Sequence, residues 1–155
     1  SILLDPATSL DDRAEALLMA ADRAQHAAEV IRPALAGGRH VVCDRYTYSS
    51  IAYQGYGRGL DPAEVRRISA WATDELWPDV VILLDVDPEQ ASARIQRDRD
   101  RFEQADAAFH QRVRSGFLEL AADPGPVLDL LRGTTAHHGP DDARRLVQLI
   151  VDADR

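Results

Sequence analysis

The chain has 155 residues, 45% hydrophobic and 28% charged, which is typical of a single globular domain spanning residues 1–155. Its formal net charge of −8 argues against a nucleic-acid polymer as partner, and no apolar run approaches the about 20 residues needed to cross a membrane. The single cysteine, Cys43, suits a reducing compartment, so we expect a cytoplasmic protein. All 18 cationic residues are arginine, which excludes the lysine-containing phosphate loop GxxxxGK[ST] from these residues.

The first half of the chain predicts two helices separated by a buried strand. Residues 11–35 repeat apolar side chains at spacings of three and four, which indicates a helix that its proline should kink. Residues 40–44 predict a strand, and a short helical or irregular piece should follow over residues 45–54. The glycines of residues 55–59 predict a loop, and residues 61–76 a helix with a proline in its first turn.

The second half continues the alternation of strands and helices. Residues 79–85 (DVVILLD) are continuously apolar, as in a strand buried on both faces of a parallel sheet. We expect helices beginning at Asp87 and spanning about residues 106–122, a strand over residues 127–131, and a last helix over residues 139–151. Its apolar face would carry Ala143, Leu146, Val147, Ile150 and Val151. This order predicts an α/β fold, a parallel sheet with helices on both faces.

The strand end at Asp44 and Arg45 is the sharpest local signal. Ligands of parallel α/β sheets bind beyond the carboxyl ends of the strands. An arginine there is a rigid fork for a phosphate or a carboxylate, and the adjacent aspartate could hold Mg²⁺ through water or orient an attacking oxygen. The alternative is a simple ion pair at the end of a strand.

All four tyrosines of the chain lie within residues 46–56, together with serines and a glutamine. Aromatic faces beside hydroxyl and amide groups suit a planar polar ring such as a nucleobase, although each tyrosine taken singly also fits ordinary core packing. Arg23, one helical turn after Met19, is either a ligand contact or a surface ion pair.

Arginines cluster with acidic residues between Arg94 and Arg101. Such alternation is typical of a solvated helix face. The functional alternative is a lid whose arginines close over transferring phosphoryl oxygens, because charge stabilisation supplies most of phosphoryl-transfer catalysis.

Segments in consistent order resemble the thymidylate kinase family, which moves a phosphoryl group from ATP to dTMP. They read AEALLMAADRAQHAAEVIRPAL, VVCDRYTYSSIAYQGYGRGL, PDVVILLDVDPEQASAR, and DRFE with FHQRVRSGFLELA. The resemblance covers most of residues 11–122. It implies the P-loop nucleoside monophosphate kinase fold, a role in dTTP biosynthesis, ATP with Mg²⁺ as the phosphoryl donor, dTMP as the acceptor, and a homodimer.

The resemblance also implies roles for individual residues. Arg45 would bind the dTMP phosphate, with Asp44 beside it near the magnesium ion and the transferring group, and Arg23 would hydrogen-bond the thymine edge. The base and sugar would be lined by Met19, Ser50, Tyr53 and Gln54. A lid over about residues 94–105 would supply the catalytic arginines Arg94, Arg97 and Arg101.

Two side chains depart from the family pattern. Met19 stands where the family usually stacks a phenylalanine on thymine, and Phe117 stands where a tyrosine is common. Methionine covers a ring with less fixed geometry. These departures leave open a kinase for another pyrimidine monophosphate.

The larger departure is at the front of the chain. The family opens with a strand, a P-loop with its lysine, a helix and a second strand, and none of these matches residues here. We therefore expect an incomplete record of a longer protein, with little kinase activity in this chain alone and a strand-wide gap in its sheet. The alternative is a non-catalytic module that binds a nucleotide or another protein.

Overall fold

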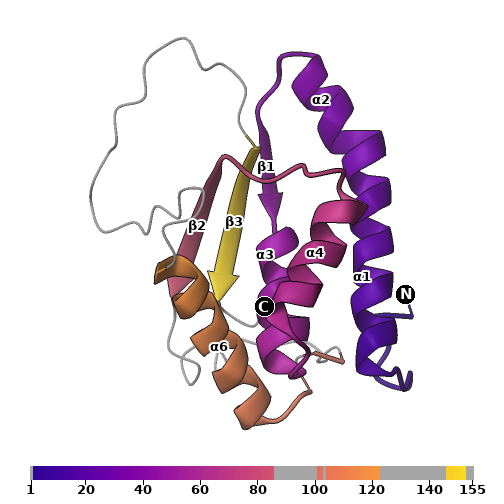
Figure 1. The fold of residues 1–155 in the computed structure, drawn as a ribbon, viewed down its shortest axis with the longest axis vertical. Coiled ribbons are helices and arrows are strands. Elements are labelled where there is room, and N and C mark those ends of the chain that lie inside the picture. Colours follow the sequence, from indigo (N-terminus) through magenta and orange to yellow (C-terminus); the bar gives the residue numbers. More distant parts are fainter. Residues whose placement is uncertain (1, 86–100, 103, 123–145, 153–155) are drawn as a thin grey trace.

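Three parallel strands form the sheet in the part of the chain that the structure describes (Figure 1). The structure is a computed structural model, and it describes residues 2–85, 101–102, 104–122 and 146–152. The strands are β1 (Val41–Asp44), β2 (Val80–Asp85) and β3 (Leu146–Asp152), in the order β1-β3-β2. Because all three run in the same direction, their carboxyl ends lie at one edge of the sheet.

The central position of β3 overturns two expectations. Residues 146–151 were predicted to lie on a helix, yet they form a strand whose backbone pairs with β1 on one side and β2 on the other. The strand-wide gap expected in the sheet is not found among the described strands, because β3 lies between β1 and β2. The physical reason is that the facing edges of β1 and β2 would otherwise have unpaired backbone N–H and C=O groups. A strand between them forms hydrogen bonds with both edges. The predicted strand over residues 127–131 and the helix beginning at Asp87 lie outside the described residues.

The long first helix has a change of geometry near its end. It runs as α1 (Asp12–His26), η1 (Ala27–Ile31) and α2 (Arg32–Ala36), and η1 is a π-helical turn. Pro33 lies two residues after the end of η1, and it has no N–H with which to continue the α-helical hydrogen bonds. The predicted helix is thus confirmed, and its interruption lies beside its proline.

Two further predicted helices are confirmed. They are α4 (Pro62–Ala72) and α6 (Ala107–Ala122), and Asp61 caps the first by accepting a hydrogen bond from a backbone N–H two residues on. Helix α4 ends earlier than expected, because the residues after it turn into the left-handed region, with φ of 51° at Asp74. The guanidinium of Arg32 donates to backbone carbonyl oxygens at this end, including that of Asp74 at 2.6 Å.

The expected loop over residues 55–59 is helical for much of its length. Residues after β1 form α3 (Thr47–Ser50) and the π-helix η2 (Ile51–Gly57). Gly57 packs so closely on α6 that an added Cβ would lie 2.7 Å from side chains of that helix. Position 57 therefore requires glycine because of close packing against α6, whereas Gly59 has a φ of 77° and forms the turn.

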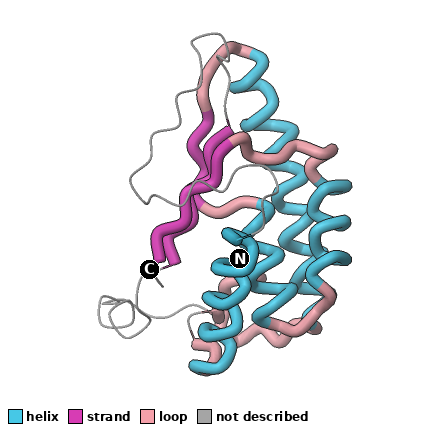
Figure 2. Tube along the Cα trace, turned by 60° about the vertical axis from the view of Figure 1, so that its left-hand side comes forward, coloured by secondary structure: helices cyan, strands magenta, loops and turns pink. Residues whose placement is uncertain are grey.

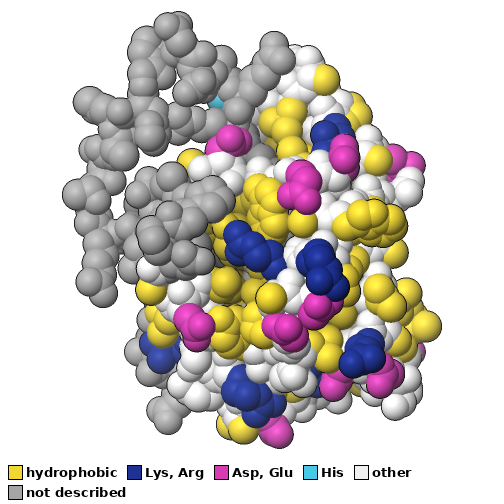
Figure 3. All heavy atoms as spheres, viewed as in Figure 1, with side chains coloured by type: hydrophobic (Ala, Val, Ile, Leu, Met, Phe, Trp, Pro, Cys, Tyr) yellow, Lys and Arg dark blue, Asp and Glu magenta, His cyan; other side chains and the backbone are white. Residues whose placement is uncertain are grey.

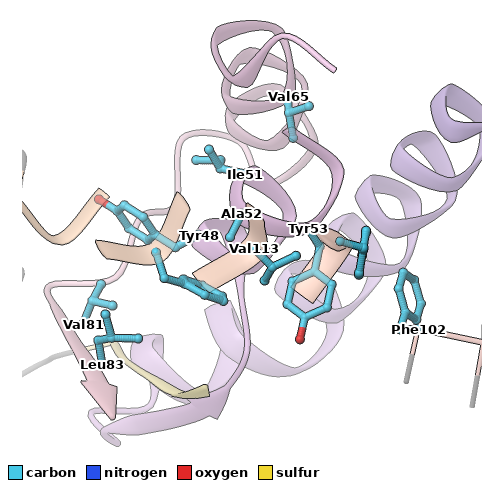
Figure 4. Close-up of a cluster of buried hydrophobic side chains, with 11 residues drawn as sticks. Tyr48, Ile51, Ala52, Tyr53, Val65, Val81, Leu83, Phe102 and Val113 are labelled. Atoms are coloured by element: carbon cyan, nitrogen blue, oxygen red, sulfur yellow. The ribbon is translucent and has the colours of Figure 1, made fainter. Parts of the chain in front are cut away.

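The described helices lie on one side of the sheet (Figure 2), so a second helical layer remains a prediction. The main core lies between this layer and β2, and it is built from η2, α3, α4, α6 and Phe102 (Figure 4). A smaller cluster joins Ile31, Cys43 and Tyr46. Figure 3 shows arginine, acidic and hydrophobic side chains interspersed on one described face. None of the described helices has the length and apolar character needed to span a bilayer.

Candidate nucleotide site

Arg45 follows β1 directly and has an unusual backbone conformation. Its φ is 62°, in the left-handed region where a non-glycine residue costs of order 1–3 kcal/mol and where functional residues concentrate. The Arg45 guanidinium lies 5.0 Å from the centroid of the Tyr53 ring, within cation–π range. The arginine predicted at the strand end is therefore placed there, against an aromatic face.

A second arginine meets the same helical segment from α1. Arg23 is half-buried, and its guanidinium donates a hydrogen bond to the hydroxyl oxygen of Ser50, itself buried. Burial lowers the pKa of Arg23 to about 10, and the nearby carboxylate of Asp22 opposes this shift. Arg23 remains a cation at neutral pH. The structure thus brings together Arg23, which the resemblance assigns to the thymine edge, and Ser50, which it assigns to the base and sugar pocket.

Tyr53 is enclosed by aromatic rings. It makes edge contacts with Phe102, Phe109 and Phe117, whose centroids lie 5.9, 5.9 and 6.1 Å away. Figure 4 shows the Phe102 ring beside that of Tyr53. Met19 packs on the same cluster from α1. The tyrosine ring is therefore a fixed platform between the core and Arg45, and Phe117 contributes to it as an aromatic support.

Gln54 is buried beside Tyr53 but faces a polar partner. Its side-chain amide donates to Oε1 of Glu15 at 2.9 Å. Glu15 is fully buried in the first turn of α1, and it also accepts hydrogen bonds from Arg58. Nothing local in the sequence marks Glu15 or Arg58 for this role, because their contacts join segments more than 40 residues apart.

Only one of the predicted lid arginines lies among the described residues. Arg101 forms an ion pair with Glu15, with 2.6 Å between Nη2 and Oε2. Arg94 and Arg97 lie outside the described residues, so their roles remain predictions.

A metal site is not preformed by protein side chains in the described part of the chain. No three or more His, Cys, Asp or Glu residues gather there in a way that could hold an ion. Asp44 is the last residue of β1, one residue before Arg45. A single carboxylate fits Mg²⁺, which keeps several waters and takes its remaining ligands from substrate phosphates.

A parallel α/β sheet with an arginine at its carboxyl edge, an aromatic platform and a second, half-buried arginine is typical of the class of nucleotide-binding α/β proteins. Comparisons with known proteins narrow this class. Residues 1–129 match the profile of the thymidylate kinase family. The chain belongs to this family.

Individual relatives agree with the family match. The thymidylate kinase of Cutibacterium acnes is 54% identical over 122 residues, covering 78% of this chain and 59% of that protein. That of Solidesulfovibrio magneticus is 52% identical over 132 residues, covering 79% of this chain and 63% of that protein. The crystal structure of thymidylate kinase from Ehrlichia chaffeensis has a TM-score of 0.65 at 31% identity, covering 81% of this chain and 61% of that one. The chain thus spans less than two thirds of these proteins.

Proposed function

We propose that this chain carries the dTMP-binding part of a thymidylate kinase, which transfers the γ-phosphoryl group of ATP to dTMP and releases ADP and dTDP. The observation that carries this proposal is Arg45 at the end of β1, held in a left-handed backbone conformation against the Tyr53 ring. Within a member of the thymidylate kinase family, such an arginine suits the acceptor phosphate.

In this proposal Arg45 and Arg23 bind different parts of dTMP. Arg45 would bind the 5′-phosphate through charge-assisted hydrogen bonds, which are about twice as strong as neutral ones. Arg23 would donate to the thymine edge from the position that its bond to Ser50 fixes. Met19 and Tyr53 would cover the base and the deoxyribose with apolar surface.

Asp44 would hold Mg²⁺ through water, and the metal would neutralise charge on the phosphates of ATP and dTMP. The 155 residues contain no lysine, so no GxxxxGK[ST] loop for the ATP phosphates lies within them. We therefore propose that this chain alone binds dTMP and turns it over slowly or not at all. Arg94 and Arg97 remain proposed contacts of the transferring group.

We also propose a cytoplasmic homodimer. The single cysteine is a free thiol, which suits a reducing compartment. Large apolar side chains are exposed on the helical layer, at Leu17, Val30 and Trp71. Sedimentation should give twice the mass of the chain, and a monomer at all concentrations would refute the dimer.

Calorimetric titration with dTMP tests the proposed function. Arg45→Ala should weaken dTMP binding about 10- to 100-fold, because a hydrogen bond to a charged group contributes roughly 1.5–3 kcal/mol. Arg67 is exposed on α4 and pairs with Glu64, so Arg67→Met is a matched loss of charge that should leave binding unchanged. Circular dichroism confirms that each variant is folded.

Other nucleotides distinguish the alternatives. Tighter binding of dCMP or dUMP than of dTMP would favour a kinase for another pyrimidine monophosphate. A folded wild-type chain that binds no nucleoside monophosphate would overturn the proposal and leave the interaction module. Rapid turnover of dTMP and ATP by this chain, abolished in Arg45→Ala, would refute only the proposed lack of activity.

A further inference from the structure

The carboxylate of Glu15 is the centre of a buried polar cluster. It is 0% exposed and accepts hydrogen bonds from Gln54 Nε2 at 2.9 Å, Arg58 Nε at 3.2 Å and Arg58 Nη2 at 3.1 Å. Arg101 Nη2 lies 2.6 Å from its Oε2, in an ion pair that is not aligned as a hydrogen bond. We call Glu15, Gln54, Arg58 and Arg101 the Glu15 cluster.

The carboxylates and guanidiniums of this cluster come from separate segments of the chain, so they compensate one another's charge only while these segments remain in contact. The side chains of Arg58 and Arg101 are 21% and 12% exposed, and Asp12 adds a second carboxylate 3.7 Å from Arg58 Nε. Removing one partner of a buried ion pair leaves the other charge without compensation, which strongly disfavours that arrangement. Glu15 therefore ties α1 to η2 and to the segment that contains Arg101.

The guanidinium of Arg101 is occupied on several sides. Its Nε donates to the backbone carbonyl oxygen of Leu3 at 3.0 Å, and its backbone N–H donates to that of Leu4 at 3.3 Å. The guanidinium carbon also lies 4.8 Å from the ring centroid of Phe102, the next residue. These contacts fix the position of Phe102. They also direct the Arg101 guanidinium toward the Glu15 carboxylate and the Leu3 carbonyl oxygen.

Ring contacts extend from this anchored segment to the proposed phosphate site. Phe102 packs edge-on against Tyr53 (Figure 4). The guanidinium of Arg45 in turn lies over the Tyr53 ring. Gln54, the residue after Tyr53, is held by Glu15 itself. Two residues of the proposed nucleoside site thus depend on Glu15: Gln54 directly, and Tyr53 through Arg101 and Phe102.

We propose that Glu15 and Arg101 are positioning residues that fix the Tyr53 ring and the Gln54 amide for the nucleoside, and that Arg101 does not contact the phosphate. This inference rests on the proposed dTMP site and assigns Arg101 a role different from the catalytic one that the resemblance implies. A positioning residue affects the ligand with or without its phosphate, whereas a phosphate contact affects only the phosphorylated ligand.

Titration of each variant with dTMP and with thymidine separates these roles. Arg101→Met should weaken both ligands by the same factor, about tenfold, which lies within the range for coupled neighbouring residues. Arg45→Ala should weaken dTMP and leave thymidine binding nearly unchanged. Arg67→Met, the exposed matched control, should change neither.

Coupling between Glu15 and Arg101 supplies a second readout. Glu15→Gln should weaken both ligands, and adding Arg101→Met to it should cause little further loss. The NMR signals of the Gln54 side-chain amide should shift in both single variants before any ligand is added. A merely structural role would lower the urea midpoint while leaving the affinities and the amide signals of the folded protein unchanged.

The outcomes are distinguishable. Loss of dTMP affinity alone in Arg101→Met, or no change for either ligand, would overturn the inference. If the wild-type chain binds neither ligand, the proposed function fails instead. If Arg101→Met does not fold, Arg101→Lys keeps the charge but loses the planar fork, and it should weaken both ligands equally; loss for dTMP alone would again overturn the inference.

Discussion

Replacing Gly57 by alanine tests the packing that carries the residues after β1. The new Cβ would lie 2.7 Å from Phe109 Cε2 and 2.7 Å from Val113 Cγ2, whereas carbon atoms prefer separations of about 3.5–4.0 Å. Both side chains are only 2% exposed, so they have little room to move. Overpacking of this kind costs about 1–3 kcal/mol, and alanine regains up to about 1 kcal/mol in a helix, so we expect a net loss of about 1–2 kcal/mol.

Urea unfolding followed by tryptophan fluorescence measures this loss, and a second substitution identifies its cause. Val113→Ala should make room for the new methyl group, so the double variant should lose less stability than the sum of the single losses, by more than about 0.5 kcal/mol. Gly59→Ala is the control, because its cost comes from a φ of 77° and nothing lies within 4 Å of its Cβ. Its effect should add to that of Val113→Ala. Wild-type stability of Gly57→Ala, or additivity in both pairs, would refute the reasoning.

Three further predictions concern other parts of the fold. Burial raises the pKa of the Cys43 thiol above its ordinary value of 9.0. Iodoacetamide should therefore label the folded chain far more slowly than the urea-unfolded chain at pH 9, and equal labelling rates would contradict this. Because the folded state holds the thiol proton more tightly, the free energy of unfolding should fall as the pH rises above 9. Arg32→Ala removes the donors to the carbonyl oxygens of Thr73 and Asp74, at 2.9 and 2.6 Å. It should lower the free energy of unfolding by about 1 kcal/mol in urea titrations. An unchanged urea midpoint would show that these hydrogen bonds at the end of α4 do not stabilise the fold. Residues 146–152 should show strand-type ¹³C chemical shifts and slow amide exchange, and helical shifts would contradict the central strand.

Elements with an unambiguous local pattern were predictable from the sequence. The continuous apolar run of β2 and the capped, proline-started helix α4 both have strong signals within one segment. Residues 146–152 carry no such signal, because apolar residues spaced by three and four within a short run also fit a buried strand. Their strand conformation depends on pairing with two distant strands, which local periodicity does not contain.

The glycines after β1 show a similar limit. Alternate glycines indicate a turn when only the backbone is considered, and that holds for Gly59. At Gly57 the requirement comes instead from a helix about 50 residues later in the chain, whose side chains leave no space for a Cβ. Tertiary packing thus overrides a local turn signal.

The part of the candidate site at Asp44 and Arg45 was predictable, because these charged residues come at the end of an apolar strand. The Glu15 cluster was not, because an acidic residue in the first turn of a helix is ordinary on a surface. The role of Glu15 becomes visible only in the folded chain, where Glu15 is buried against Arg58 and Arg101. For the same reason the sequence did not indicate that Arg101 pairs with Glu15, because the two residues lie far apart in the chain.

A crystal structure of this chain with dTMP tests the central claim most directly. The account predicts the 5′-phosphate against the guanidinium of Arg45, the thymine edge at Arg23, and the sugar beside Tyr53. It also predicts Arg101 still paired with Glu15. A nucleotide bound elsewhere, or a phosphate held by Arg101 in place of Arg45, would contradict the account.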